Sequence, residues 1–342
     1  MDDQQYESFF VNERSEIYQL KKNINKLSQR VGLSENQQAK LDIIIAEITS
    51  NFLKHATAPG EVLYRPIRWE GVSLGIEIIG IDHGPGMDNV GHLMEDGIST
   101  TRTMGTGIGA IKRLSDEFDI YSSPGWGTLL LSRMLTEKEA PPITRAPLRY
   151  VTLMVPYPGE EVCGDGMSYK QRGDRHSFLL TDGLGHGPYA HEASKQAAKA
   201  FQHTPSMEPS VIIQHIHEAI ASTRGAVGMV LTVDLAQHTL DYCGVGNISM
   251  RKISDTLTKQ ALSTQGILGQ NVSKRRMATS FSWDDEAWLV LHSDGIESKW
   301  SITDYPGLMY RDLSLWAAAL YKDRKRAKDD CAIWAIKLKT TR

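Results

Sequence analysis

The sequence lacks the features that would direct it into a membrane or to an oxidising compartment. It has no apolar run of the roughly 18 residues that a membrane-spanning helix needs. Its first ten residues, MDDQQYESFF, are acidic and lack the cationic stretch of a signal peptide. The three cysteines, Cys163, Cys243 and Cys331, form no CxxC pair and leave an odd count. We therefore expect a reduced, cytoplasmic protein that has no membrane partner and no disulfide framework.

The sequence also lacks a large net charge and internal repeats. The net charge is −3, with 38 basic against 41 acidic residues, so there is no electrostatic footprint for nucleic acid. We find no internal repeat. Hydrophobic content of 41% and charged content of 23% are those of an ordinary globular protein. At 342 residues the chain is long for one hydrophobic core, which predicts two domains.

One predicted helix organises the first half, after a polar segment over residues 11–30. It covers Ser34–Ala56, where Ser34 and Gln37 have the spacing of a capping box and apolar residues recur at helical spacing. An acid and an amide on one face suit a divalent metal and a base beside phosphates; the alternative is a solvated polar face. Three polar residues four apart share that face: Glu47, Asn51 and His55.

Two predicted strands, Val62–Trp69 and Gly75–Asp82, follow this helix. Asp82 ends the second strand, just before Gly84 and Gly86, where the backbone must turn tightly or approach a ligand closely. A carboxylate at this place can accept the hydrogen bond of an adenine amino group. An aspartate that caps its own turn is the alternative.

A glycine triplet comes next, and we expect it to precede a helix over Ala110–Phe118. Free N–H groups and the helix dipole make such a place a phosphate site. The segment lacks both the strand context of a dinucleotide fold and the GK[ST] of a P-loop, so neither assignment holds. A turn and a closing strand with Gly127 and Thr128 end the half. The triplet is Gly105, Gly107 and Gly109.

In this order the four motifs resemble the N, G1, G2 and closing boxes of the GHKL ATPases, over about residues 10–135. Within that fold they are most similar to the anti-sigma factors and RsbT-like serine-switch kinases. The resemblance implies an α/β sandwich that binds ATP and Mg²⁺. It implies Glu47 as general base, Asn51 as magnesium ligand and Asp82 as adenine reader. Arg102 and Thr103 lie where a more glycine-rich lid is expected. The remaining nucleotide-binding candidates are His55, Gly84, Gly86, Gly105, Gly107, Gly109 and Thr128.

A proline-rich stretch over residues 137–148 predicts a linker, after which a strand begins near Arg149. In the second half, acids stand at four strand ends. Two of them, Asp165 and Asp182, flank a polar loop, and antiparallel pairing of their strands would bring the carboxylates side by side. A single Asp-Gly is more often a turn, but a set of four favours magnesium or manganese over zinc. The others are Asp294 and the pair Asp329–Asp330.

These acid motifs resemble the SpoIIE/RsbX branch of the metal-dependent protein phosphatases (the PPM family) over about residues 149–340. The resemblance implies a β-sandwich flanked by helices and a site for two Mn²⁺ or Mg²⁺ ions that hydrolyses phosphoserine or phosphothreonine. Asp329 is favoured over Asp330. His186 either protonates the leaving oxygen or caps the next helix. The implied ligands are Asp165, Asp182, Asp294 and Asp329, with the carbonyl of Gly183.

Together the two resemblances predict an α/β (α+β) chain with a kinase domain over 1–136, a linker over 137–148 and a phosphatase domain over 149–342. Both families act on small STAS-type antagonist proteins, so we expect opposed activities on one partner. A sigma factor or a stressosome-like complex is a further expected partner. In the alternative, the first domain only binds, as an anti-sigma factor or ATP-gated docking module, and only the phosphatase turns over.

Overall fold

The computed structural model describes residues 5–69, 72–88, 104–136, 147–254, 258–272, 278–283 and 286–339. They form two compact units, which we describe one at a time. One unit comprises Tyr6–Pro142 and Ile302–Lys322; the other comprises Met1–Gln5, Ile143–Ser301 and Asp323–Arg342. The domain bounds predicted from the sequence do not include this exchange of segments. Most of the predicted linker lies outside the described residues.

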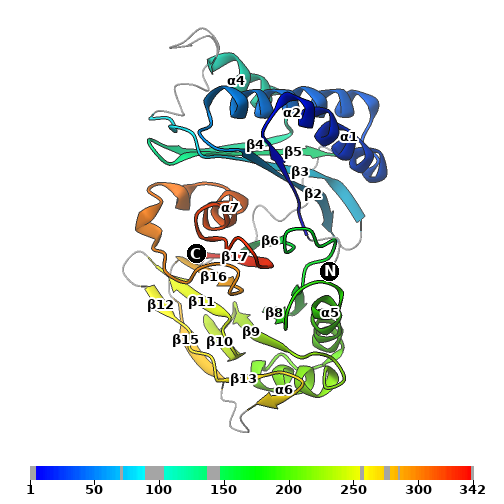
Figure 1. Ribbon diagram of the computed structural model, residues 1–342. Helices are drawn as coiled ribbons and strands as arrows, with labels where there is room; N and C mark the ends of the chain where they lie inside the picture. The colour runs from blue at the N-terminus through cyan, green and yellow to red at the C-terminus, as the bar shows by residue number, and fades with distance from the viewer. Residues whose placement is uncertain are drawn as a thin grey trace. The chain divides into compact units, whose positions relative to one another are not determined.

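The first unit contains a five-stranded antiparallel sheet with the order β1-β2-β3-β5-β4. Helices α1, α2 and α4 lie over one face of this sheet (Figure 1). Their buried side chains form one core cluster with the inward-facing strand residues. The α/β sandwich predicted for this half is confirmed. The bounds are β1 Glu7–Val11, α1 Arg14–Val31, α2 Glu35–His55, β2 Gly60–Trp69, β3 Val72–Asp82, α4 Met104–Leu114, β4 Glu117–Ser123 and β5 Gly127–Leu135.

Helix α2 begins as the sequence predicts. Ser34 is its N-cap, and its hydroxyl and the side chain of Gln37 form the two halves of a capping box. The apolar positions at helical spacing are all buried against the sheet. This leaves the neighbouring face, which carries the polar candidates, at the edge of the core. The buried positions are Leu41, Ile44, Ile45, Ile48 and Phe52.

The segment predicted as polar over residues 11–30 is largely helix α1 (Arg14–Val31), with Leu20, Ile24, Leu27 and Val31 buried along one stripe. One sequence prediction for this unit is wrong. The glycine triplet does not precede a helix, because all three glycines lie inside α4. Gly107 is needed there for space: a Cβ at this position would stand 2.6 Å from a carboxylate oxygen of Glu47.

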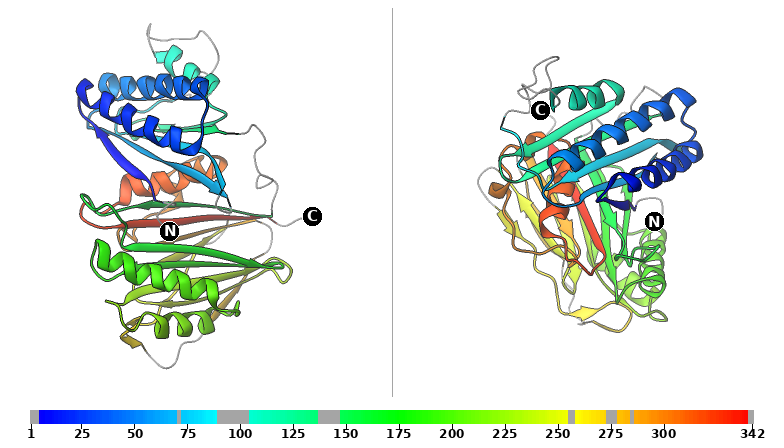
Figure 2. Two further views of the ribbon diagram at one scale, coloured as in Figure 1. Left: turned by 90° about the vertical axis from the view of Figure 1, so that its right-hand side faces the viewer. Right: turned by 45° about the horizontal axis from the view of Figure 1, so that its top comes forward.

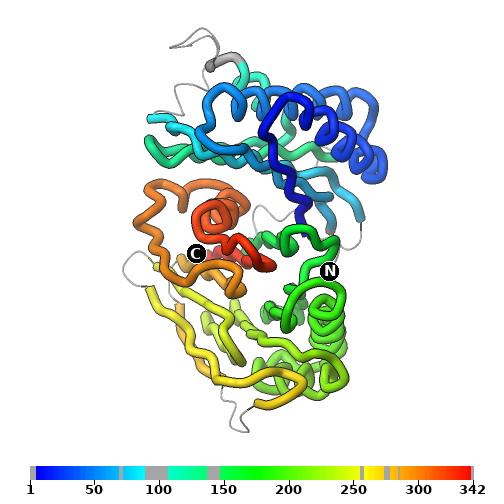
Figure 3. Tube along the Cα trace, in the orientation of Figure 1, coloured from blue at the N-terminus to red at the C-terminus, as the bar shows by residue number. Residues whose placement is uncertain are grey.

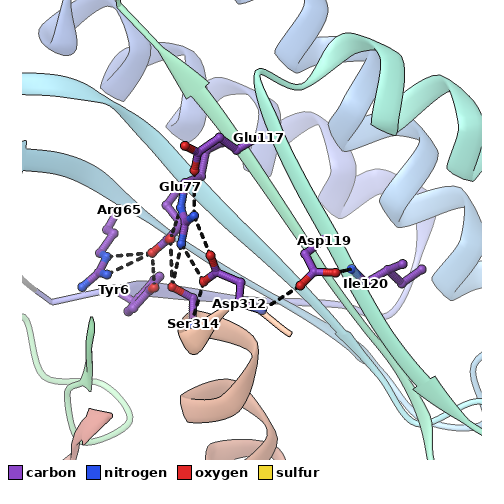
Figure 4. A network of polar contacts seen from close by, with 9 residues as sticks. Tyr6, Arg65, Glu77, Glu117, Asp119, Ile120, Asp312 and Ser314 are labelled. Carbon is purple, nitrogen blue, oxygen red and sulfur yellow. Dashed lines mark hydrogen bonds and ion pairs between the residues drawn. The ribbon is translucent and has the colours of Figure 1, made fainter. Parts of the chain in front are cut away.

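The segment Ile302–Lys322 comes from the second half of the chain but belongs to this first unit. It holds the short helices η3 (Ile302–Asp304) and η4 (Leu308–Tyr310) and most of α7 (Leu313–Arg324). In the trace of Figure 3, the segment is the orange stretch that lies beside the sheet on the face away from α1 and α2. A network of charged side chains, seen in Figure 4, joins it to the strands.

The second unit contains two five-stranded sheets with the orders β15-β10-β9-β8-β7 and β12-β11-β16-β17-β6. One hydrophobic cluster draws residues from both sheets, including Phe178, Leu289 and Trp334, so the sheets pack face to face. Helices α5 and α6 pack with their own apolar cluster on the outer face of β8 and β9, which Figure 2 shows from two further directions. The predicted β-sandwich flanked by helices is confirmed.

The strand predicted to begin near Arg149 is present as β6. Asp165 begins its strand instead of ending one. Trp283, Trp288 and Trp334 are buried in this unit, as are the three cysteines. The bounds are β6 Leu148–Val155, β7 Asp165–Arg172, β8 Arg175–Gly183, α5 Pro188–His203, α6 Pro209–Ala219, β9 Ala226–Asp234, β10 Thr239–Val245, β11 Ser249–Ile253, β12 Thr258–Gln260, β13 Gly266–Ile267, β14 Asn271–Val272, β15 Thr279–Ser282, β16 Glu286–His292 and β17 Cys331–Lys339.

Candidate active sites

A pocket in the first unit lies between α2, α4 and the ends of β3 and β5. Its polar lining includes Asn51, His55, Asp82 and Thr128, which come from three distant parts of the sequence, and Gly86 forms part of its rim. An apolar wall completes it, to which Phe52, Met87, Ile108, Ile120 and Leu130 contribute. A mostly apolar concavity with a few convergent polar groups suits a planar, uncharged ring such as a nucleobase.

Asp82 combines both readings that its sequence context allows. One carboxylate oxygen accepts a 2.7 Å hydrogen bond from the backbone N–H of Gly84, so it does cap its own turn. The side chain also lines the pocket, opposite Thr128 in the β3–β5 ladder. Burial raises the pKa of Asp82, while the bonds from Gly84 and Thr128 oppose that rise. One oxygen is thus used for the turn, and the other is the candidate acceptor for a ligand.

Two glycines shape this corner by giving the backbone room. Gly86 has a φ of +70°, and a Cβ there would stand 1.9 Å from the carbonyl oxygen of Ser123. A Cβ at Gly84 would stand 2.9 Å from the carbonyl oxygen of His55, at the end of α2. The Asp82 turn therefore packs directly against the helix that carries the other candidates.

The catalytic candidate Glu47 lies one helical turn from Asn51, but it is not among the residues that line the pocket. It lies against α4 instead, since a Cβ at Gly107 would stand 2.6 Å from its carboxylate oxygen and 3.8 Å from the side-chain oxygen of Asn51. Gly105 and Gly109 also stay outside the described pocket lining. Arg102 and Thr103, where a lid was expected, lie outside the described residues.

In the second unit, Asp165 and Asp182 pair directly across the β7–β8 hairpin. Asp165 is 1% exposed, and within the described part of the chain neither of its carboxylate oxygens has a hydrogen-bond partner. Burial, followed by the charge of Asp182, raises the pKa of Asp165. Burial and the charge of Asp294 likewise raise the pKa of Asp182 to about 8. Carboxylates that repel one another in a buried place fit a divalent cation between them.

The other acids lie at the same edge but in different surroundings. Asp294 accepts a 2.8 Å hydrogen bond from the side-chain amide of Asn247. Asp330 is buried and accepts a 2.8 Å bond from the backbone N–H of Tyr157. Asp329 is partly exposed, and the charge of Asp294 is among the causes that raise its pKa, after burial. In the described ranges, however, no three histidine, cysteine or acidic side chains are gathered into a preformed metal cluster.

Helix α5 holds this edge in place from behind. His191 Nδ1 lies 2.9 Å from the carbonyl oxygen of Cys163, and Ser194 donates a 2.6 Å hydrogen bond to the carbonyl oxygen of Gly164. A Cβ at Gly183 would stand 2.2 Å from the carbonyl oxygen of Ala190, so only glycine allows the helix this close. The sequence analysis missed these supports because buried serine and histidine on a helix carry no distinctive spacing.

His186 does not cap α5, whose N-cap is Gly187. Its Nδ1 lies 2.7 Å from a carboxylate oxygen of Glu160, and its ring stacks on Tyr157 with centroids 4.2 Å apart. The side chain is 53% exposed. Glu160 and Tyr157 therefore hold the imidazole at a fixed orientation on an accessible loop, two contacts that the sequence analysis missed.

Arg224 is a further group at this edge that the sequence analysis missed. Its backbone lies beside the DGLGHG loop, since Leu184 N–H bonds to the carbonyl oxygen of Gly225, and Ala226 pairs with Gly183. The guanidinium carbon lies 4.7 Å from the ring centre of Tyr189. Its Nη1 is 3.1 Å from where a Cβ of Gly185 would stand. An exposed cation thus lies beside the loop that follows Asp182.

Comparison with known proteins agrees with this division. Residues 10–133 match the histidine kinase-like ATPase domain family, and residues 172–339 match the stage II sporulation protein E (SpoIIE) family. The first half is similar to the serine/threonine-protein kinase RsbT of Bacillus subtilis (strain 168), with 34% identity over 110 residues. That match covers 32% of this chain and 79% of RsbT. The chain belongs to both families.

The SpoIIE-type half is similar to the phosphoserine phosphatase RsbX of the same organism, with 26% identity over 141 residues, 40% of this chain and 69% of RsbX. A solved chain from work on the bacterial stressosome, "a modular system that has been adapted to control secondary messenger signaling", has a TM-score of 0.52 and 27% identity. It is matched over 55% of this chain and 98% of its own length. RsbX in complex with magnesium has a TM-score of 0.50 and 21% identity, over 56% of this chain and 95% of its own.

The chain is therefore a signalling regulator that joins a kinase-like ATPase domain to a PPM-type protein phosphatase domain, a class that depends on metal. Among the residues that the structure describes, no helix is both long and apolar enough to cross a bilayer.

Proposed function

We propose that the chain is a bifunctional regulator: an ATP-dependent serine/threonine kinase and a metal-dependent phosphoserine/phosphothreonine phosphatase that act on one STAS-type partner. The observation that carries the phosphatase half is the buried pair Asp165–Asp182, whose like charges call for a cation. Four acids and one carbonyl would hold Mn²⁺ or Mg²⁺ there: Asp165, Asp182, Asp294, Asp329 and Gly183.

When bound, two such ions supply an activated water and neutralise charge on the phosphoryl group. The chain's own side chains do the rest. Arg224 would bind the phosphoryl oxygens in a bidentate manner, since its guanidinium lies beside the loop after Asp182. His186, held at Nδ1 by Glu160, has Nε2 for transferring a proton to the leaving serine oxygen. Asp330 would position Asp329 by its bond to the Tyr157 backbone.

In the kinase half, Asp82 would accept the adenine amino group against the apolar wall of the pocket. Asn51 would ligate Mg²⁺ beside the phosphates, with His55, Gly84, Gly86 and Thr128 around the nucleotide. Glu47, one turn away from Asn51, would take the proton of the substrate hydroxyl. The similarity to RsbT, a serine/threonine-protein kinase, supports this assignment.

One observation favours the second candidate, in which the first domain only binds nucleotide or a partner. Glu47 lies against Gly107 of α4 and does not line the pocket, whereas Asn51 and Asp82 do. A binding module needs the pocket but not the base. The two candidates differ in one result: Glu47→Gln abolishes phosphotransfer in a kinase and changes nothing in a binding module.

Similarity to RsbT and RsbX in one chain supports a shared partner for the two halves, and the stressosome relative supports a partner-switching complex or a sigma factor pathway around it. Pull-down with the full chain, followed by phosphosite mapping on any STAS-domain protein recovered, identifies that partner. Recovery of no STAS-domain protein would contradict this part of the proposal.

The phosphatase assignment is tested with the full chain, a phosphoserine peptide and added Mn²⁺. Wild type should release phosphate only with metal, and a chelator should stop it. Asp182→Asn should be inactive, whereas Asp174→Asn, an exposed acid in the turn of the same hairpin, should match wild type. Metal-independent release by wild type would rule the assignment out.

A further inference from the structure

Between Asp294 and Asp329, one segment of the chain belongs to the ATPase unit. We call this segment, Ile302–Lys322, the excursion. The chain leaves the phosphatase unit after Ser301 and returns at Asp323. The two ends are tied together: Ile296 and Lys325 form a β-bridge, and Arg326 N–H bonds to the carbonyl oxygen of Gly295 at 2.7 Å. The two bridged residues, Ile296 and Lys325, therefore each lie within a few residues of a candidate metal ligand, Asp294 or Asp329.

A buried ionic network anchors the excursion to the ATPase sheet. Arg133 on β5 forms two hydrogen bonds with Asp312, of 2.9 and 3.0 Å, and an ion pair of 2.6 Å with Glu77 on β3. Ser314 donates to Glu77 at 3.0 Å, and Asp119 accepts from the backbone N–H of Asp312 at 2.7 Å. Glu77 is 2% exposed, and Figure 4 shows Tyr6, Arg65 and Ser314 joined to it, with Asp119 joined to Asp312 at one side.

Breaking such a network is costly, because removing one partner leaves a buried charge uncompensated. The contacts of Asp312 and Ser314 with Arg133, Asp119 and Glu77 therefore make the segment Ile302–Lys322 part of the ATPase unit.

Only the sheet itself separates the excursion from the nucleotide pocket. Successive residues of a strand point to opposite faces. On β5, Thr128 and Leu130 line the pocket, whereas Arg133 is on the face of the excursion. On β3, Asp82 lines the pocket and Glu77 holds Ser314. A shift of either strand on ligand binding must therefore move groups on both faces.

The last residue of the excursion contacts the corner of the pocket. The ammonium of Lys322 donates a 2.7 Å hydrogen bond to the carbonyl oxygen of Trp126 and lies 3.9 Å from the centre of its ring. The edge of Tyr305, at the start of the excursion, also meets this ring, with centroids 6.1 Å apart. Trp126 is followed at once by Gly127 and Thr128, which close on Asp82. Six residues separate Lys322 from Asp329.

We propose that adenine nucleotide in the pocket controls the phosphatase edge through the segment Ile302–Lys322, so that the pocket is an effector site for dephosphorylation. This inference rests on the proposed function, in which the pocket binds nucleotide and the acidic edge binds metal. Nucleotide that reshapes the Trp126–Thr128 corner displaces Lys322, and the chain carries that displacement to Asp329. The coupling is reciprocal, since metal at the edge must change nucleotide affinity by the same factor.

The test follows two readouts in the full chain at constant free Mg²⁺, with and without ADP. The first is hydrogen exchange of the amides in residues 323–331, and the second is turnover of p-nitrophenyl phosphate. ADP should change both, the second by about fivefold or more. Lys322→Met keeps the aliphatic stem but removes the ammonium, so ADP should still bind and neither readout should respond. Lys299→Met, an exposed lysine just before the excursion, should respond as wild type does.

Separate measurement of ADP binding, by fluorescence of a labelled ADP, keeps this inference distinct from the proposed function. If ADP binds and wild type turns over with metal, but neither exchange nor turnover responds to ADP, the coupling is wrong and the two sites stand. If both respond equally in Lys322→Met, a route other than this segment connects the sites, which also overturns the proposal. If ADP does not bind, the nucleotide site itself is wrong and the coupling fails with it.

Discussion

Asp165 stands directly opposite Asp182 in the β7–β8 hairpin, and burial raises the pKa of both carboxyl groups, with the charge of Asp182 adding to the rise at Asp165 and the charge of Asp294 adding to the rise at Asp182. Two ionised carboxylates in such a place raise the free energy of the folded state unless a cation or hydrogen-bond donors compensate their charge. Asp294 and Asp329 lie at the same edge, and the charge of Asp294 raises the pKa of both Asp182 and Asp329, so a divalent cation would offset several repulsions at once.

Metal should therefore stabilise the protein as well as activate it. Saturating Mn²⁺ should raise the thermal unfolding midpoint of wild type by several degrees, because a ligand that binds only the folded state shifts the equilibrium. Asp182→Asn should lose this response, whereas Asp174→Asn should keep it. The measurement is differential scanning fluorimetry with and without chelator, and an unchanged response in Asp182→Asn would contradict a metal at this edge.

Arg224→Ala should weaken substrate binding without weakening metal binding. Loss of a bidentate contact to phosphate costs about 1.5–3 kcal/mol, which corresponds to a rise in KM of about ten- to a hundredfold for a phosphoserine peptide. Arg172→Ala, at the far end of the β7–β8 hairpin, is the matched control. A normal KM in Arg224→Ala, or a parallel loss of Mn²⁺ affinity measured by calorimetry, would remove Arg224 from phosphate recognition.

Asp82→Asn should abolish ADP binding, because the amide can turn its N–H₂ toward the adenine amino group and leave two donors facing each other. Glu47→Gln should bind ADP as wild type does, since Glu47 does not line the pocket. Glu35→Gln, in the exposed first turn of the same helix, controls for the change of charge. Titration with labelled ADP distinguishes these variants, and ordinary affinity in Asp82→Asn would show that another group reads the base.

The ionic network around Glu77 should make the ATPase unit sensitive to acid. Burial acts to raise the pKa of Glu77, but the guanidinium groups of Arg133 and Arg65 outweigh it and hold the pKa well below its usual value. A carboxyl with a lowered folded-state pKa contributes stability that is complete above about pH 4.5 and is lost as the pH falls below that value.

Glu77→Gln should therefore destabilise the ATPase unit by about 3–5 kcal/mol at pH 7, and its stability should fall less steeply than that of wild type between about pH 4.5 and pH 2. Urea unfolding at a series of pH values, followed by hydrogen exchange of β3 and β5, measures both effects. If the free energy of unfolding fell equally with pH in the two proteins, Glu77 would not be the group responsible for the loss of stability in acid.

Local sequence signals predicted much of this structure. The capping box at Ser34 is present, and the pairing of Asp165 with Asp182 follows from the length of the polar turn between their strands. The sequence analysis missed α1 and misplaced the glycine triplet because tertiary packing, and not the local sequence pattern, determines those two segments. The polar residues of α1 masked a stripe of four buried apolar positions, and Gly107 of α4 packs closely on Glu47 instead of lying in a loop.

Long-range placement is the part that the sequence could not show. Arg133 and Asp312 are 179 residues apart, and no local pattern around either residue identifies the other as its partner. The same holds for Arg224, which reaches the metal edge only because Ala226 pairs with Gly183. Such contacts depend on strand order and register, which arise from the packing of the whole sheet.

The central claim is that opposed kinase and phosphatase sites act on one residue of one partner. Intact-mass spectrometry of the STAS-domain protein that co-purifies with the chain, followed over time with ATP and Mn²⁺, tests it directly. Wild type should leave the partner partly phosphorylated while ATP is steadily consumed. Asp294→Asn should drive it to full phosphorylation and Glu47→Ala to none. Phosphate that Asp294→Asn places on one residue, but that wild type removes only from another, would contradict the claim.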